Sequence, residues 1–120
     1  MKTARIFIFI LFLIVLSVYS CENNDNANVS YAYEAEVRGL NMDCGLYEIK
    51  ITKGLEKVED MIGLSPEEGV YIATNLPQNL EEPGLIILLD MRNPTSNELG
   101  MCSTMGLSYP WLYVTRTEKK

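Results

Sequence analysis

The sequence predicts an all-β fold, namely a small five-stranded antiparallel barrel with at most one short helix. Five short segments either alternate apolar and polar residues or are continuously apolar, as strands do. Gly- and Pro-rich turns separate them, and a single short stretch has helical spacing. The chain has 120 residues, enough for one domain. A doubly wound nucleotide-binding fold or an (α/β)₈ barrel is excluded, because both need far longer chains.

The first two predicted strands have a half-buried pattern. Apolar residues occupy every second position of residues 33–37 and again of residues 47–51, with charged residues between them. A period of two with polar alternates indicates a strand with one face in the core. The turn-rich residues 39–45 connect the two strands.

A short helix and a third strand are expected next. Between Gly54 and Gly63, four apolar residues follow helical spacing. A helix this short is stable only when it packs against the rest of the domain. Residues 65–69 then predict a turn, and residues 70–74 predict the third strand.

The fourth and fifth predicted strands each follow a long loop. After a loop at residues 75–84, residues 85–89 are apolar on both faces, which indicates a central strand. A second loop, residues 93–110, leads to the fifth strand at residues 111–117. Closure into a barrel removes the sheet edges that invite aggregation, so we expect a five-stranded, OB-like barrel. An open sheet packed on one helix is the alternative.

The N-terminus predicts a signal peptide over residues 1–20. Lys2 and Arg5 form a short positive region, and residues 6–16 are 11 unbroken apolar residues. This stretch is too short for a membrane span of about 20 residues and fits the apolar region of a signal peptide.

The end of this segment, Val18-Tyr19-Ser20-Cys21, resembles the lipobox of bacterial lipoproteins. The resemblance implies cleavage before Cys21, a diacylglycerol on its thiol and often an acyl chain on the new amine. Two or three chains make a stable anchor, since each buried CH₂ contributes roughly 0.8 kcal/mol. An ordinary secreted protein and a retained membrane anchor remain the alternatives.

Residues 21–30 are polar and Asn-rich, which predicts a flexible tether that buries too little apolar surface to become ordered. Glu22 and Asp25 resemble the surface-export signals of lipoproteins in the Bacteroidota. The expected location is therefore the outer membrane, with the domain in the periplasm or on the surface.

Once Cys21 carries lipid, Cys44 and Cys102 remain. An exported chain meets an oxidising compartment, so these two cysteines predict one disulfide, worth roughly 4 kcal/mol in the chain-entropy model. A redox-active pair is the alternative, although the spacing is not C-x-x-C.

Four short elements are spread over residues 31–120. They are Asp43-Cys44-Gly45 before a strand, Asn75-Leu76-Pro77, Pro83-Gly84-Leu85 at the start of an apolar strand, and Cys102 before the last strand. Together they resemble a group of small lipoproteins of the Bacteroidota. The resemblance implies a disulfide-stapled β domain and brings no activity or catalytic residue with it.

The charge and composition disfavour several function classes. The chain has no histidine, and from Cys21 onward it has 8 basic residues (10 minus Lys2 and Arg5) against 16 acidic ones, a net charge of −8. Nucleic-acid binding is disfavoured, because phosphate contacts need clustered Lys and Arg. No catalytic motif is present, so we expect no enzyme, no catalytic residue and no cofactor.

The acidic residues are better explained without a metal or a catalytic role. The oxygen-bearing residues between Asn41 and Glu48 lack the spacing of a calcium loop, which favours an Asx-type turn. The pairs Glu67-Glu68 and Glu81-Glu82 lie in turns and are expected to be solvated. Asp90, at the end of a strand, is expected to be solvated or hydrogen bonded.

The candidate binding surface is the aromatic segment that contains Tyr109, Trp111 and Tyr113, because Tyr and Trp are enriched at interface hot spots. The alternative is that Trp111 or Tyr113 fills the core. The function predicted is a lipid-anchored binding or structural module of the cell envelope that contacts a protein or glycan. The alternative is an inhibitor or accessory of an envelope enzyme such as a lysozyme-type hydrolase, since acidic charge suits a basic partner.

Overall fold

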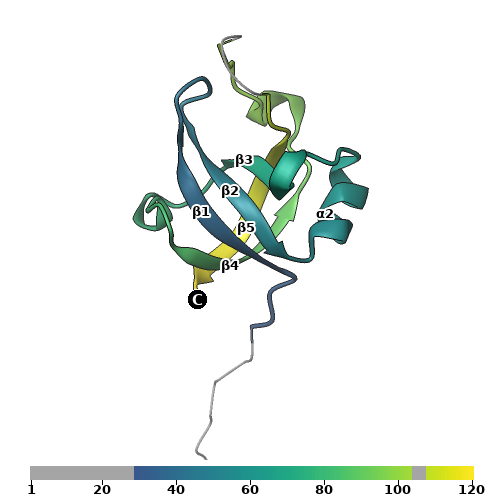
Figure 1. The fold of residues 1–120 in the computed structure, drawn as a ribbon, viewed down its shortest axis with the longest axis vertical. Helices are drawn as coiled ribbons and strands as arrows, with labels where there is room; N and C mark the ends of the chain where they lie inside the picture. Colours follow the sequence, from purple (N-terminus) through teal and green to yellow (C-terminus); the bar gives the residue numbers. More distant parts are fainter. Residues whose placement is uncertain (1–28, 104–107) are drawn as a thin grey trace, which may run out of the picture.

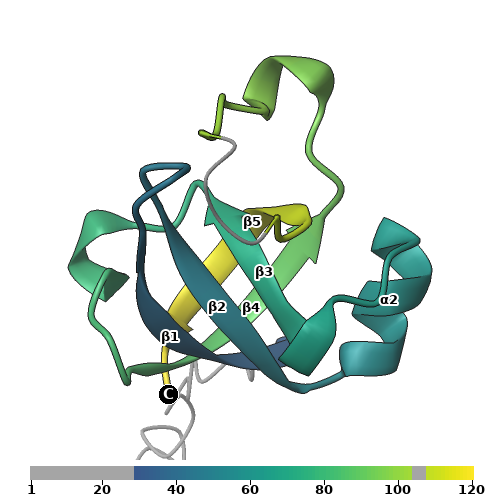
Figure 2. The same cartoon turned by 45° about the horizontal axis from the view of Figure 1, so that its top comes forward.

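The computed structural model describes residues 29–103 and 108–120, which form a closed five-stranded β-barrel (Figures 1 and 2). Within these residues, the prediction of a barrel with at most one short helix is confirmed. Three short 3-10 turns complete the domain: η1 (Glu67–Gly69), η2 (Gln78–Leu80) and η3 (Ser96–Glu98). The strands and the helix are β1 (Tyr33–Asn41), β2 (Leu46–Lys53), α2 (Leu55–Ile62), β3 (Val70–Thr74), β4 (Ile86–Arg92) and β5 (Trp111–Lys119).

Around the barrel the strand order is β1-β2-β3-β5-β4, with β4 returning to β1. Four of the five pairings are antiparallel, whereas β3 and β5 are parallel, with Ile72 opposite Trp111. The prediction of a wholly antiparallel barrel is therefore wrong for one pair. The reason is geometric, because strand direction cannot alternate at every step around a closed ring of five. The order and mixed orientation are compatible with an OB-like barrel.

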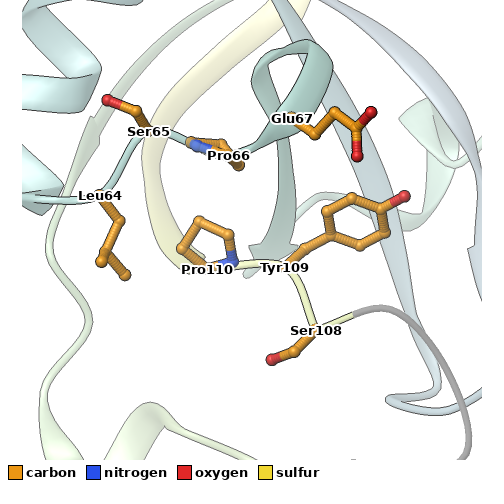
Figure 3. A pocket seen from close by; sticks show the side chains of 7 residues that line it. All are labelled: Leu64, Ser65, Pro66, Glu67, Ser108, Tyr109 and Pro110. Atoms are coloured by element: carbon orange, nitrogen blue, oxygen red, sulfur yellow. The ribbon is translucent and has the colours of Figure 1, made fainter.

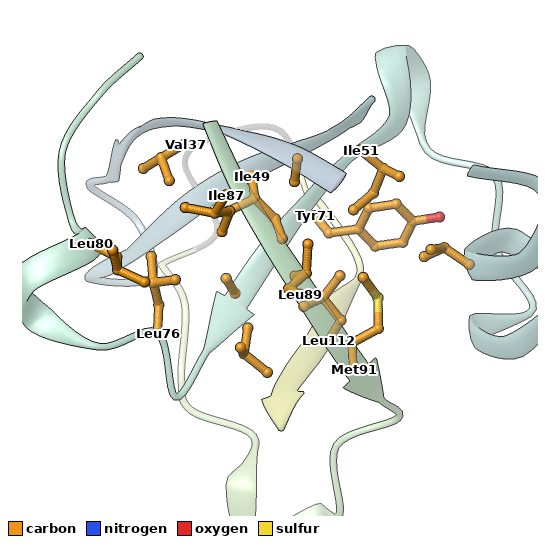
Figure 4. Close-up of a cluster of buried hydrophobic side chains, with 14 residues drawn as sticks. Val37, Ile49, Ile51, Tyr71, Leu76, Leu80, Ile87, Leu89, Met91 and Leu112 are labelled. Carbon is orange, nitrogen blue, oxygen red and sulfur yellow. The ribbon is translucent and has the colours of Figure 1, made fainter. Parts of the chain in front are cut away.

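The barrel interior is filled by every second residue of the strands, as the period-two patterns predicted (Figure 4). On β4, for example, Ile87 and Leu89 are fully buried, while Ile86 and Leu88 between them are half-buried on the outer face. Residues between positions 35 and 114 supply the whole core cluster. It comprises Ala35, Val37, Ile49, Ile51, Val58, Tyr71, Ala73, Leu76, Leu80, Ile87, Leu89, Met91, Leu112 and Val114.

Helix α2 is held by its packing rather than by side-chain caps. Val58 is fully buried, and three further apolar residues of the helix pack against the core. Gly54 and Gly63 bound the helix in the left-handed conformation, with φ of 88° and 76°. A Cβ on Gly54 would lie 2.7 Å from the Tyr33 ring, whereas a Cβ on Gly63 would meet nothing within 4 Å.

Candidate functional site

A disulfide joins Cys44 and Cys102, with a Cα–Cα distance of 4.1 Å, so the predicted pairing is confirmed. Cys44 lies in the turn between β1 and β2, and Cys102 lies in the long connection between β4 and β5. The disulfide therefore fastens this connection to the tip of the β1–β2 hairpin, at one end of the barrel (Figure 2).

Hydrogen bonds reinforce this junction. The Ser103 backbone N–H donates to the Asp43 carbonyl at 2.9 Å, and the Ser103 hydroxyl donates to the Asp43 carboxylate at 2.6 Å. The buried Asn41 side chain accepts from the Cys44 N–H at 2.9 Å and donates to the Glu48 carboxylate at 2.8 Å. The Asn41 side chain thus stabilises the turn locally, through a bond from the backbone three residues further on. Among the described residues, no three acidic or cysteine side chains gather to hold a metal ion.

The first half of β5 turns its aromatic residues outward. Leu112 and Val114 are buried in the barrel, whereas Trp111 and Tyr113 are half-buried on the outer face. The alternative in which Trp111 or Tyr113 fills the core is therefore wrong. Trp111 packs against the β4–β5 connection, since a Cβ on Gly100 would lie 3.0 Å from its ring.

The ion pair between Arg92 and Glu98 packs against the Tyr113 ring. The Arg92 guanidinium carbon lies 3.9 Å from the centre of the Tyr113 ring. The same guanidinium donates two hydrogen bonds to Glu98, at 2.7 and 2.8 Å, and the Thr95 N–H donates a third at 2.8 Å. The hydrogen bonds from Arg92 and then from Thr95 lower the pKa of Glu98 to about 2. The carboxylate thus stays ionised and holds the guanidinium against the ring.

Tyr109 lines an open groove of about 320 Å³ between two chain segments (Figure 3). One wall is residues 64–67, which follow α2, and the other is residues 108–110, which precede β5. The lining residues are Leu64, Ser65, Pro66, Glu67, Ser108, Tyr109 and Pro110. Leu64 is 58% exposed, so its apolar side chain is open to a ligand at the groove.

Both walls are fixed to neighbouring residues of β3. The Tyr71 phenol donates to the Leu64 carbonyl at 3.3 Å, and burial raises the pKa of Tyr71, which keeps the phenol protonated. The Ile72 N–H donates to the Pro110 carbonyl at 2.9 Å. Because Tyr71 and Ile72 are fully buried, these hydrogen bonds attach both walls of the groove to the barrel core.

Sequence reasoning found only one wall of this groove. Tyr109 was a candidate, but residues 65–69 were predicted only as a turn, with Glu67 and Glu68 solvated. Glu67 and Glu68 are indeed exposed. The exposed Leu64 next to a Ser-Pro turn is the signal that could have pointed to a surface, although no pattern in the sequence places it beside Tyr109.

Asp90 has a structural role. It accepts hydrogen bonds from the Ala32 N–H and the Arg116 side chain, both at 2.9 Å. The bond from Ala32, and then those from Arg116, lower the pKa of Asp90. The Arg116 side chain also donates to the Ser30 carbonyl at 2.8 Å and stacks over Tyr31. The chain is therefore attached to the barrel from Ser30 onward.

Cys21, the signal peptide at residues 1–20 and most of the tether at residues 21–30 lie outside the described residues. Within the part of the chain that the structure describes, no helix has the length and apolar character needed to cross a membrane. Comparison of the chain with protein-family models, curated proteins and solved structures found no match.

Proposed function

We propose that this chain is a lipid-anchored binding module of the cell envelope, attached through Cys21 to the outer membrane and facing the periplasm or the surface. Its contact surface is the groove between residues 64–67 and 108–110, together with the neighbouring aromatic residues Trp111 and Tyr113. The partner is an envelope protein or a glycan. The proposal includes no catalytic residue and no cofactor.

The observation that carries the proposal is the groove itself. Leu64, Pro66 and Pro110 present apolar surface to solvent, and hydrogen bonds to β3 hold both walls in place. A pre-formed apolar concavity with a few polar groups is the usual form of a binding site, because little conformational entropy is lost when the ligand enters. The lipid anchor rests on the lipobox-like sequence before Cys21.

A second candidate function is an inhibitor or accessory of an envelope enzyme such as a lysozyme-type hydrolase. The exposed carboxylate of Glu67 in the groove and the net charge of −8 from Cys21 onward favour it. An acidic surface steers and holds a basic enzyme. Inhibition assays against basic hydrolases of the envelope separate this function from simple binding.

The contact surface is tested by affinity capture from envelope extract with residues 29–120, which contain the whole core and the disulfide. Tyr109→Ala should remove the captured partner. Tyr31→Ala is the matched control, because Tyr31 is also half-buried but lies against Arg116, outside the groove lining. Equal capture by the two variants would contradict the proposed surface.

The anchor is tested in cells with Cys21→Ser. This change should abolish incorporation of labelled fatty acid and leave the precursor uncleaved before residue 21. Normal processing and normal membrane association of the variant would contradict the lipid attachment.

A further inference from the structure

The groove has two chemically different ends. Leu64 and Pro110 make one end apolar, whereas the side chains of Glu67 and Tyr109 project toward the other end, with Pro66 between (Figure 3). A carboxylate near an aromatic ring is suited to a cation, because the carboxylate contributes an ion pair and the ring face attracts positive charge.

Nothing in the described part of the chain neutralises this end. Glu67 is exposed, and no Lys or Arg of the described residues lies within ion-pair distance of its carboxylate. The seven lining residues include this one acid and no base. The chain from Cys21 onward is also negatively charged, with a net charge of −8. A cationic ligand is therefore attracted at long range and then meets an unpaired carboxylate.

We propose that the groove binds a Lys or Arg side chain on a partner protein. The cationic head lies between Glu67 and Tyr109, and the aliphatic stem and a neighbouring apolar residue lie on Leu64, Pro66 and Pro110. Long basic side chains bury their stems on apolar surface in this way while the charged head stays partly solvated. This inference rests on the proposed function and names the chemistry that the same site recognises.

The size of the groove agrees with this ligand. Its volume of about 320 Å³ is at the lower end of the range of about 300 to 1,000 Å³ found for ligand pockets. It therefore accommodates one or two side chains of an extended segment rather than a large cofactor.

The test is an NMR titration of residues 29–120, disulfide intact, with four defined probes. Three are acetylated tripeptide amides, Leu-Lys-Pro, Leu-Arg-Pro and Leu-norleucine-Pro, the last of which keeps the aliphatic stem and lacks the charge. The fourth is a tetramer of N-acetylglucosamine, which represents an envelope glycan. The two cationic peptides should shift the amide signals of residues 64–67 and of Ser108 and Tyr109, with Kd of about 1 mM or somewhat weaker. The norleucine peptide should bind at least about 3-fold more weakly.

Matched variants locate the charge effect. Glu67→Gln should weaken binding of the Lys peptide about 3- to 5-fold and leave binding of the norleucine peptide unchanged. Glu68→Gln is the control, because Glu68 is the adjacent exposed acid and does not line the groove. Equal binding of the Lys and norleucine peptides, equal effects of the two Gln variants, or tighter binding of the glycan would overturn the inference.

The two proposals can fail separately. If affinity capture depends on Tyr109 but is unaffected by Glu67→Gln, the groove is the contact surface and the inference about a cationic side chain is wrong. If capture is independent of Tyr109 and the peptides do not shift the groove, both proposals are wrong.

Discussion

Removal of the disulfide by the double change Cys44→Ser and Cys102→Ser should lower the free energy of unfolding while leaving the barrel folded. The two cysteines are 58 residues apart in the sequence. The chain-entropy model for a closed loop of that length gives about 4 kcal/mol, most of it from the greater freedom of the unfolded chain. The hydrogen bonds between Ser103 and Asp43 remain at the junction, so we expect a loss of about 2 to 4 kcal/mol.

The assay is guanidinium unfolding followed by the fluorescence of Trp111, the only tryptophan. The double variant should unfold at lower denaturant with a steeper dependence, because its unfolded chain exposes more surface. Reduction of the unmodified domain should reproduce the variant and serves as the control. A loss below about 1 kcal/mol would refute the entropic argument. Loss of the β-type circular dichroism spectrum would refute the claim that the barrel forms without the disulfide.

Three further predictions concern the barrel. Because the pKa of Glu98 is depressed, its interaction with the Arg92 side chain stabilises the fold above about pH 4.5 and is lost as the pH falls toward about 2. The unfolding midpoints of the unmodified domain and of Glu98→Gln should therefore converge between these two pH values. Gly54→Ala should destabilise the domain by about 2 to 4 kcal/mol, because φ at this position is 88° and the added Cβ clashes with the Tyr33 ring. Gly63→Ala has the strained φ without a clash and should cost about 1 to 2 kcal/mol in the same denaturation assay. Leu112→Ala should lower the free energy of unfolding by about 2 to 5 kcal/mol, whereas Thr115→Ala on the exposed part of β5 should change it by less than about 0.5 kcal/mol. Similar losses for the two variants would contradict the claim that Leu112 faces the barrel interior.

The strands and the helix were predictable because their signals are local. The alternation at residues 33–37 and 47–51 follows from one buried face, and Gly54 and Gly63 mark the helix boundaries. The strand ends were less predictable. β1 continues to Asn41 through Gly39, a residue type depleted in strands, because a register shift between Val37 and Gly39 accommodates the irregularity.

The orientation of β5 could not be read from the sequence. Residues 111–114 are Trp, Leu, Tyr and Val, so every position is apolar or aromatic and no alternation identifies the inner face. Packing inside the barrel determines which side chains of β5 face inward. The more compact Leu112 and Val114 fit the interior, while Trp111 and Tyr113 remain partly in solvent.

The groove was unpredictable for a different reason. Its two walls are more than 40 positions apart in the sequence, and each wall alone has the pattern of an ordinary turn. Only the parallel pairing of β3 with β5 brings them together, because the chain enters both strands at the same end of the barrel. A tertiary pairing of this kind leaves no trace in the local pattern.

The most direct test of the central claim is site-specific photo-crosslinking of the full chain in living cells. A photoreactive amino acid at Ser108 places the probe in the groove, and one at Glu82 places it on an exposed loop outside the groove lining. The account predicts a discrete adduct from position 108 that disappears with Tyr109→Ala and is absent from position 82. The same adduct from both positions, or an adduct from position 108 that survives Tyr109→Ala, would contradict the claim that the groove is the binding surface.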